Sequence, residues 1–261
     1  MKPNALILTG NGLNTEKELD YSLRAAGATA RIATLYELVD GDVDLGDYQM
    51  LAICGGFSDG DDLGAGVATA KRLGEAGDEM RRFFDRDTLT YGVCNGFQIL
   101  VKMGVFNDGA RRDLTLTYND AGFFYDGWVR LKADPDSRCV FTKGLGALYL
   151  PVRHGEGKFT TKDDPTLQRL HSNGQVAMQY VDAQGNTATK FPENPNGSVD
   201  AIAGACDKTG RIFGTMPHFE AFNSITNHPH YTRMKREIGA GVDDVEPDGI
   251  KLFRNMVSYF S

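Results

Sequence analysis

The sequence predicts an α/β fold, in which an open, mainly parallel sheet is covered by helices on both faces and carries a partly antiparallel extension. In the N-terminal half, short apolar runs alternate with stretches whose apolar residues recur at helical spacing, which is the pattern of strand-helix-strand units. In the C-terminal half, apolar runs follow one another with only turn residues between them, which favours antiparallel pairing. The 261 residues, 41% of them hydrophobic, can bury one core, so we expect a single domain over residues 1–261.

The N-terminal half is predicted to hold four strands that alternate with helices or glycine-containing loops. The strands are expected at residues 4–9, 28–35, 49–54 and 89–94, and the helices at 15–27, 65–84 and 95–105. Leu19, Leu23 and Ala26 recur at helical spacing in the first helix, so one of its faces packs on the sheet. Right-handed crossovers between such strands make the sheet parallel.

The C-terminal half is predicted to extend this sheet rather than to form a second domain. Its apolar runs lie at residues 127–133, 147–152, 174–181, 199–206 and 211–217, with Gly, Asn and Asp in the turns between them. Residues 250–260 have the spacing of an amphipathic helix packed on the sheet. The polar segment 228–248 is predicted to be a surface excursion.

Composition and charge argue against several classes of function. A net charge of −7 and a pI near 5.3 disfavour nucleic-acid binding, because a phosphate-binding surface needs clustered Lys and Arg. No stretch approaches the roughly 20 apolar residues that cross a bilayer, and the sequence reaches Gly10 too soon for a signal peptide. The four cysteines form no Cys-x-x-Cys pair, so neither a zinc site nor a dithiol switch is predicted. We therefore expect a cytoplasmic protein without a bound metal or a membrane contact.

A nucleophile is predicted at Cys94. Residues 92–96, Gly-Val-Cys-Asn-Gly, match the pattern Gly-x-nucleophile-x-Gly where a buried strand turns into a helix. The glycines allow close backbone approach in a tight turn, and a helix N-terminus favours the reactive thiolate. The Asn95 N–H can then donate to an oxyanion. The alternative is a structural cysteine beside two turn glycines, and Cys54 also ends a strand, just before Gly55.

A base and a group to orient it are predicted in residues 216–220, Met-Pro-His-Phe-Glu. His218 and Glu220 are two residues apart just after an apolar strand, so in an extended backbone both side chains point to one side. A cysteine nucleophile needs such a base, and the base needs a carboxylate to fix its tautomer. A surface histidine with an acidic neighbour by chance is the alternative. His228 and His230 suggest a metal site, but no further ligand cluster is apparent in the sequence.

Two glycine-containing turns are candidates for binding a substrate. The loop 55–61, Gly-Gly-Phe-Ser-Asp-Gly-Asp, opens onto the same sheet edge as Cys94, and its backbone N–H groups suit an oxyanion hole. Phosphate binding is the alternative, but the loop lacks the Lys-Ser/Thr pair of a P-loop and the spacing of a dinucleotide fingerprint. The turn 154–157, His-Gly-Glu-Gly, can offer carboxylate and backbone groups to a charged amino acid. An ordinary turn is an equal alternative there.

Together these segments resemble the class I glutamine amidotransferases, whose domain has a flavodoxin-like sheet. The resemblance rests on the elbow GVCNGFQIL, the loop GGFSDGDDLGAG, the turn PVRHGEGKF and the ending MPHFE. It runs through most of the chain and includes Leu114-Thr115-Leu116 and Trp128-Val129. More narrowly, GGFS-x-GD together with CNGFQ is similar to the glutaminase subunits of phosphoribosylformylglycinamidine synthase, since other class I enzymes carry different residues around the same cysteine.

The resemblance implies catalytic roles for particular residues of the elbow and of the C-terminal motif. Cys94 is expected to attack the side-chain amide of L-glutamine, His218 to pass a proton to the leaving ammonia, and Glu220 to orient His218. Water resolves the resulting thioester, while backbone N–H groups at Phe57 and Asn95 hold the oxyanion. The candidate substrate-binding residues are Gly56, Gln98, His154 and Glu156.

The resemblance also implies a partner. No cofactor or metal is expected on this chain, because ATP and Mg²⁺ are used by a separate synthetase subunit that converts formylglycinamide ribonucleotide to the amidine in de novo purine biosynthesis. A small bridging subunit could complete the complex. Glutaminase activity is expected to be weak in the isolated chain and to rise on docking.

The chain departs from the family pattern at Phe219, where the family usually has Pro between His and Glu. A Pro-fixed backbone is lost there, and the ring must occupy a pocket of its own, for which the partner interface is one place. The segment 228–248 is also longer than in compact relatives. Three alternative functions are a class I amidotransferase for another acceptor, a non-glutaminase cysteine hydrolase of similar fold, and a module without catalysis.

Overall fold

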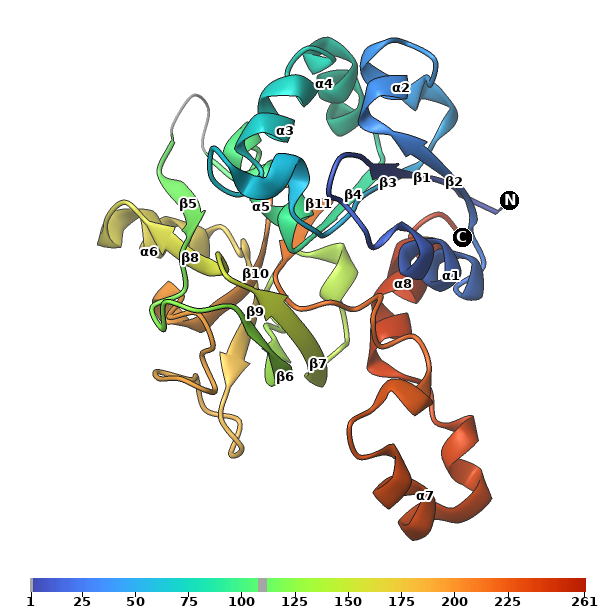
Figure 1. Ribbon diagram of the computed structural model, residues 1–261, viewed down its shortest axis with the longest axis vertical. Helices are drawn as coiled ribbons and strands as arrows, with labels where there is room; N and C mark the ends of the chain where they lie inside the picture. Colours follow the sequence, from blue (N-terminus) through green and yellow to red (C-terminus); the bar gives the residue numbers. More distant parts are fainter. Residues whose placement is uncertain (1, 108–111) are drawn as a thin grey trace.

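The computed structural model describes residues 2–107 and 112–261, and within this part of the chain nine strands form one large mixed sheet (Figure 1). Their spatial order is β2-β1-β3-β4-β11-β10-β9-β6-β7. The bounds are β1 Asn4–Thr9, β2 Thr29–Thr34, β3 Met50–Ile53, β4 Leu89–Val93, β6 Tyr125–Ala133, β7 Ala147–His154, β9 Val176–Val181, β10 Ile202–Cys206 and β11 Ile212–Thr215. A separate two-stranded sheet pairs β5 (Leu114–Thr117) with β8 (Lys158–Thr161).

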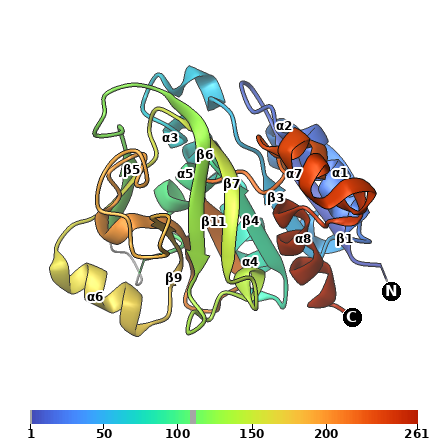
Figure 2. The ribbon, with the colours of Figure 1, turned by 90° about the horizontal axis from the view of Figure 1, so that it is seen from below.

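Helices cover both faces of the parallel half of the large sheet. The bounds are α1 Glu16–Ala25, α2 Leu35–Val39, α3 Val67–Leu73, α4 Gly77–Asp85, α5 Asn95–Met103, α6 Asp164–Ser172, α7 Tyr231–Ile238 and α8 Asp248–Ser258. Helices α1 and α8 pack together on one face, and α3 and α5 pack together on the other (Figures 1 and 2). The predicted α/β class with helices on both faces is confirmed.

The two halves of the sheet differ in strand direction and in burial. From β2 to β11 every pairing is parallel, whereas β10, β9, β6 and β7 pair antiparallel. Strands β3 and β4 are buried along their whole length, as expected for parallel strands covered on both faces, while β6 alternates buried and exposed residues in its second half. The antiparallel extension supplies four of the nine strands, at four of the five C-terminal runs that the sequence predicted, and the fifth run, residues 211–217, contains the parallel strand β11.

Some elements differ from the sequence prediction. The helix expected at 65–84 is two helices, α3 and α4, separated at residues 74–76, where Gly74 ends the first and Gly77 begins the second. Glycine gives little support to a continuous helix, because its backbone loses more conformational freedom on folding than that of other residues. Helix α6 was not predicted, although Asp163 caps it and Pro165 stands in its first turn, which are both start signals.

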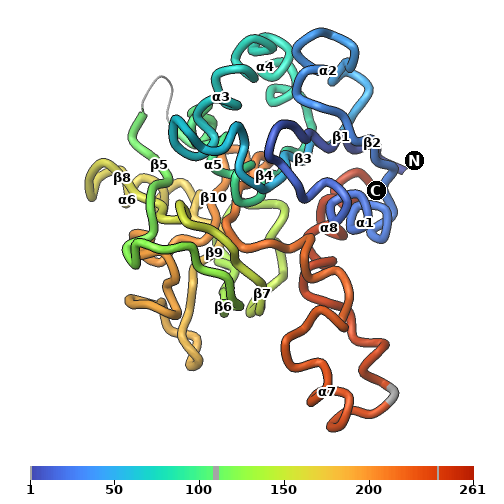
Figure 3. The backbone as a smooth tube through the Cα atoms, in the orientation of Figure 1, coloured from blue at the N-terminus to red at the C-terminus, as the bar shows by residue number. Residues whose placement is uncertain are grey.

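Residues 228–247 form an arm that projects from the body beside α8 (Figures 1 and 3). Helix α7, the main element of the arm, has no buried residue. At its base, the ring of His228 lies 5.7 Å from that of Trp128 and 5.8 Å from that of Phe222. The predicted surface excursion is therefore confirmed.

Candidate active site

Cys94 lies in a strained turn between β4 and α5. Its φ of 51° is in the left-handed region, which costs a non-glycine residue free energy and is typical of functional turns. A Cβ on Gly92 would meet the Gly96 carbonyl carbon at 2.7 Å, and a Cβ on Gly96 would meet the Ile53 carbonyl oxygen at 2.2 Å. The close backbone approach predicted for both glycines is thus confirmed.

His218 and Glu220 form a buried pair just beyond β11. Because β11 pairs with β4 in parallel, the C-terminal ends of the two strands lie at the same edge of the sheet. His218 Nδ1 lies 2.6 Å from Glu220 Oε1, and their side chains are 2% and 0% exposed. The carboxylate accepts a hydrogen bond from the Nδ1–H, which leaves Nε2 available for proton transfer.

The thiol of Cys94 and the ring of His218 converge over Gly55. A Cβ at Gly55 would lie 3.2 Å from His218 Cε1 and 3.3 Å from Cys94 Cβ. The thiol itself lies 3.7 Å from the Arg153 carbonyl oxygen. Burial lowers the pKa of His218, but the charge of Glu220, the nearby Cys94 thiol and the hydrogen bond to Glu220 outweigh burial and raise this pKa to about 9. The imidazole is therefore protonated near neutral pH, and an imidazolium beside a thiol stabilises the thiolate.

Two backbone N–H groups next to Cys94 are free to hold an oxyanion. Asn95 is the first residue of α5, so its N–H has no acceptor within the helix. The N–H of Phe57, which the sequence analysis assigned to the oxyanion hole, donates instead to the Gly12 carbonyl at 2.8 Å. For Gly56, no acceptor of its N–H is found in residues 2–107 and 112–261. The geometry therefore favours Gly56 over Phe57 as the second donor.

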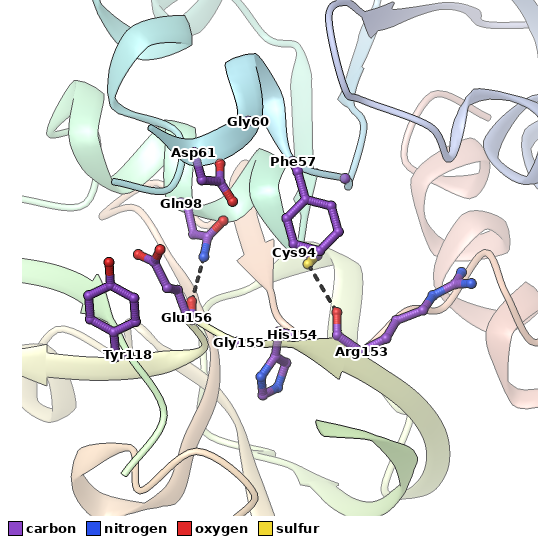
Figure 4. A pocket seen from close by; sticks show the side chains of 11 residues that line it. Phe57, Gly60, Asp61, Cys94, Gln98, Tyr118, Arg153, His154, Gly155 and Glu156 are labelled. Atoms are coloured by element: carbon purple, nitrogen blue, oxygen red, sulfur yellow. Dashed lines mark hydrogen bonds between the residues drawn. The ribbon is translucent and has the colours of Figure 1, made fainter. Parts of the chain in front are cut away.

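A cavity of about 320 Å³ opens beside the thiol (Figure 4). It is lined by Gly56, Phe57, Gly60, Asp61, Cys94, Gln98, Tyr118, Arg153, His154, Gly155 and Glu156. Gln98 Nε2 donates to the Glu156 carbonyl, and the Ala65 N–H donates to Glu156 Oε2 at 3.3 Å.

Asp61 also lines the cavity but was not predicted, although it lies in the loop 55–61 that was a candidate for binding substrate. Its Oδ1 accepts a hydrogen bond from Asn95 Nδ2 at 3.0 Å. Two carboxylates thus face a pocket with space for one amino acid.

His154 contributes backbone rather than imidazole to this pocket. Its ring points away from Cys94, Gln98 and Glu156 (Figure 4), and the side chain is 2% exposed. Burial, followed by the nearby charge of His218, lowers the pKa of His154 to about 3, so the ring is neutral. The sequence predicted that His154 binds the substrate. This orientation does not fit a direct contact between its ring and the substrate.

The comparison with known proteins agrees with this geometry. A family model described as the CobB/CobQ-like glutamine amidotransferase domain matches residues 2–260. The chain belongs to this amidotransferase family. Two similar proteins are each called phosphoribosylformylglycinamidine synthase subunit PurQ, one from Methanococcus maripaludis strain S2 and one from Dehalococcoides mccartyi; both are 38% identical over 99% of this chain and 98% of their own length. A solved structure described as PurLQS from Thermotoga maritima is 27% identical, with a TM-score of 0.72 over 100% of both chains.

A second, smaller cavity of about 90 Å³ also adjoins Cys94. It is lined by Asn14, Gly56, Phe57, Cys94, Phe124, Arg153 and His218. Exposed aromatic side chains lie at and beside these two cavities, and we call this group the aromatic rim. Its members are Phe57, Tyr118, Phe123, Phe124 and Phe191. Phe57, Tyr118 and Phe124 line a cavity, whereas Phe123 and Phe191 do not. The rings of Phe57 and Phe124 lie 6.0 Å apart and those of Phe123 and Phe191 lie 5.9 Å apart, so the rim contains two pairs of neighbouring exposed rings.

Phe219, the departure from the usual amidotransferase pattern, is fully buried. It belongs to the hydrophobic core, and a Cβ on Gly249 would lie 2.0 Å from its carbonyl oxygen. The start of α8 therefore packs against the backbone that carries His218 and Glu220. The idea that this ring lies at a partner interface is wrong, because the core of the chain itself encloses it.

The remaining candidate residues have ordinary surroundings. Burial raises the pKa of Cys54, so this thiol is neutral and a poor nucleophile. His228 packs against Trp128 at the base of the arm, and His230 packs against His228. No group of three or more metal-ligating side chains occurs among the described residues, and no helix in this part of the chain is long and apolar enough to span a membrane.

Proposed function

We propose that this amidotransferase is the glutaminase subunit of phosphoribosylformylglycinamidine synthase, acting in the cytoplasm with Cys94, His218 and Glu220 as its catalytic triad. One observation carries the proposal. A strained cysteine, a buried His-Glu pair and a carboxylate-lined pocket meet at one sheet edge, in a chain similar over its whole length to PurQ subunits. Four buried cysteines without a disulfide suit a reducing compartment.

In the first half of the reaction the thiolate of Cys94 attacks the side-chain amide carbon of glutamine. A carbon–sulfur bond forms, and the carbonyl oxygen becomes an oxyanion held by the N–H groups of Gly56 and Asn95. The His218 imidazolium gives its Nε2 proton to the amide nitrogen, the carbon–nitrogen bond breaks, and ammonia leaves a thioester on Cys94.

In the second half water replaces ammonia. Neutral His218 takes a proton from the water, the resulting hydroxide attacks the thioester carbon, and the carbon–sulfur bond breaks to release glutamate and the Cys94 thiolate. Glu220 keeps the His218 ring in the tautomer with a proton on Nδ1 in both halves.

The amino-acid end of glutamine is assigned to the far side of the pocket. Glu156 and Asp61 can pair with the α-ammonium group, and Gln98 holds the backbone of Glu156 in place. Burial of the Asp61 carboxyl raises its pKa, as does the charge of Glu156. A bound ammonium would reverse that shift, so this pair of carboxylates favours a cationic ligand.

The aromatic rim is assigned to the partner. A synthetase subunit that uses ATP and Mg²⁺ to convert formylglycinamide ribonucleotide to the amidine would dock there, with a small bridging subunit in the same assembly. Apolar side chains that are about half exposed lose unfavourable contact with water when covered. Docking on the rim would also enclose the small cavity beside His218, so that ammonia reaches the partner without escaping.

The test is glutamate release from L-glutamine by the wild type and by Cys94→Ala, each with and without the synthetase subunit, ATP, Mg²⁺ and acceptor. We expect activity that rises with the partner and falls by at least about a thousandfold in the variant. Cys206→Ala, at another fully buried cysteine outside the pocket, should keep its rate. If glutamate never forms while the partner consumes only added ammonium, the proposal fails.

A further inference from the structure

The buried ring of His154 joins three separate segments at the pocket. The first is the turn 155–157, which carries Glu156. The second is the loop 118–124, which carries three residues of the aromatic rim, and the third is the segment 191–198, which begins with the rim residue Phe191. The ring nitrogens of His154 contact Asn119 in the loop and Asn196 in the third segment, and Asn119 also holds the turn 155–157.

On the Nδ1 side, Asn119 connects the rim loop to the turn. His154 Nδ1 lies 3.1 Å from Asn119 Oδ1, which also accepts the Gly157 N–H at 2.9 Å. Asn119 Nδ2 donates to the His154 carbonyl at 2.8 Å and to the Phe123 carbonyl at 3.1 Å. The Asn119 N–H donates to the Gly155 carbonyl at 2.9 Å. One buried amide therefore fixes both ends of the turn that presents Glu156.

On the Nε2 side, Asn196 connects the second rim segment to the same ring. Asn196 Nδ2 lies 3.5 Å from His154 Nε2 and donates to the Tyr180 hydroxyl at 3.1 Å. Because Oδ1 of Asn119 is an acceptor and Nδ2 of Asn196 is a donor, the network fits only a neutral ring with its proton on Nδ1. All three residues are buried.

The fit between ring and turn is tight. A Cβ on Gly157 would lie 2.5 Å from His154 Nδ1, so the turn folds directly over the imidazole. A displacement of the ring therefore moves the turn and, with it, the carboxylate of Glu156 at the glutamine pocket.

We propose that Asn119, His154 and Asn196 form a buried bridge that transmits docking on the aromatic rim to the turn that holds glutamine. His154 is thus a positioning residue rather than a ligand of the substrate. The inference rests on the proposed function, because it assigns a regulatory route to the same glutaminase site.

The first experiment separates positioning from chemistry. His154→Leu removes both ring hydrogen bonds, and we expect the KM for glutamine of the isolated chain to rise about tenfold while kcat stays within about threefold. His154→Asn, whose amide can keep the contact with Asn119, should restore most of the KM. Alkylation of Cys94 by iodoacetamide, which needs the triad but not the turn, should proceed at the wild-type rate in both variants.

The second experiment tests the connection to the partner. Asn196→Ala breaks the link to Phe191 and its segment but leaves the Asn119 side intact. We expect the factor by which the synthetase subunit raises kcat/KM to fall at least about fivefold, with a much smaller change in the isolated chain. Equal activation of the variant and the wild type would overturn the bridge.

Two further outcomes decide the role of His154. The positioning role would be overturned if His154→Leu had a KM within about twofold of wild type. It would also be overturned if the rise in KM were matched by equal falls in kcat and in the alkylation rate. The KM of the wild type should also be constant from about pH 6 to 8, whereas a cationic His154 that binds the substrate carboxylate would lose affinity above about pH 6.5. A wild type that releases no glutamate at all would instead overturn the proposed function.

Discussion

His218 and His154 are buried to the same extent, at 2% exposure each, and lie within electrostatic reach of each other, yet they hold different charges. Beside His218 is the carboxylate of Glu220, 2.6 Å from Nδ1, and the pKa of this histidine is raised to about 9. The two ring nitrogens of His154 face side-chain amides, and burial, with the nearby charge of His218, lowers its pKa to about 3.

The difference shows that the partner, rather than the depth of burial, decides what a buried histidine does. Removal from water disfavours the charged form of either ring. A carboxylate offsets that cost and makes the ring an acid–base group, whereas a carboxamide does not and leaves the ring as a structural link. The surroundings of His218 thus suit proton transfer, and those of His154 suit a ring that holds neighbouring segments in position.

Glu220→Gln removes the difference between the two histidines, because it gives His218 an amide neighbour like those of His154. Without the carboxylate, burial alone should lower the pKa of His218 and leave it neutral, so the thiolate of Cys94 loses its counter-charge. We expect kcat for glutamate release to fall by roughly a thousandfold to ten-thousandfold at neutral pH. Steady-state kinetics at saturating glutamine measure this.

Asp200→Asn is the matched control for that substitution. Asp200 Oδ2 lies 2.8 Å from His171 Nε2, but this pair is partly exposed and lies outside the pocket. The same change from carboxylate to amide should leave the rate within about twofold, since exposed ion pairs contribute little. If Glu220→Gln were as active as this control, Glu220 would have no role in catalysis.

The sequence was sufficient to predict that His218 and Glu220 lie together near Cys94. The pattern around Cys94 and the two-residue spacing of His218 and Glu220 are local, so the side chains that work together stand close to strand ends that the apolar runs reveal. The parallel strands were predictable for the same reason.

The positioning side could not be predicted in the same way. Asn119 and Asn196 are 35 and 42 residues from His154, in segments without a strand or helix pattern. Only the fold brings them together, and an Asn in a loop looks the same in the sequence whether it is buried or exposed. The occupied N–H of Phe57 was equally hidden, since it depends on the distant carbonyl of Gly12.

The two histidines should also contribute differently to the dependence of stability on pH. The folded pKa of His218 lies above its unfolded value of about 6.5, so its contribution to the free energy of unfolding is complete below about pH 6.5 and is lost as the pH rises through about 9. The folded pKa of His154 lies below its unfolded value, so folding loses stability as the pH falls from about 6.5 toward 3.

Urea unfolding of the wild type, His218→Gln and His154→Leu at several pH values separates these two contributions. The stability difference between wild type and His218→Gln should shrink by about 1 to 3 kcal/mol from pH 6.5 to 9.5, and that between wild type and His154→Leu should shrink from pH 6.5 to 4.5. If both stability differences were constant over these pH ranges, folding would shift the pKa of neither histidine, and the two rings would carry the same charge at each pH.

Gly157→Ala should have the smallest effect and acts only on the positioning side. Its Cβ would lie 2.5 Å from His154 Nδ1, so either the ring or the turn must shift by several tenths of an ångström, and a displaced Glu156 binds glutamine less well. We expect the KM to rise about threefold to fivefold with kcat nearly unchanged. Gly77→Ala, at the open start of α4 with no atom within 4 Å of its Cβ, is the control and should match the wild type. A Gly157→Ala enzyme with an unchanged KM would mean that the turn tolerates movement of the ring, and that His154 does not set the position of Glu156.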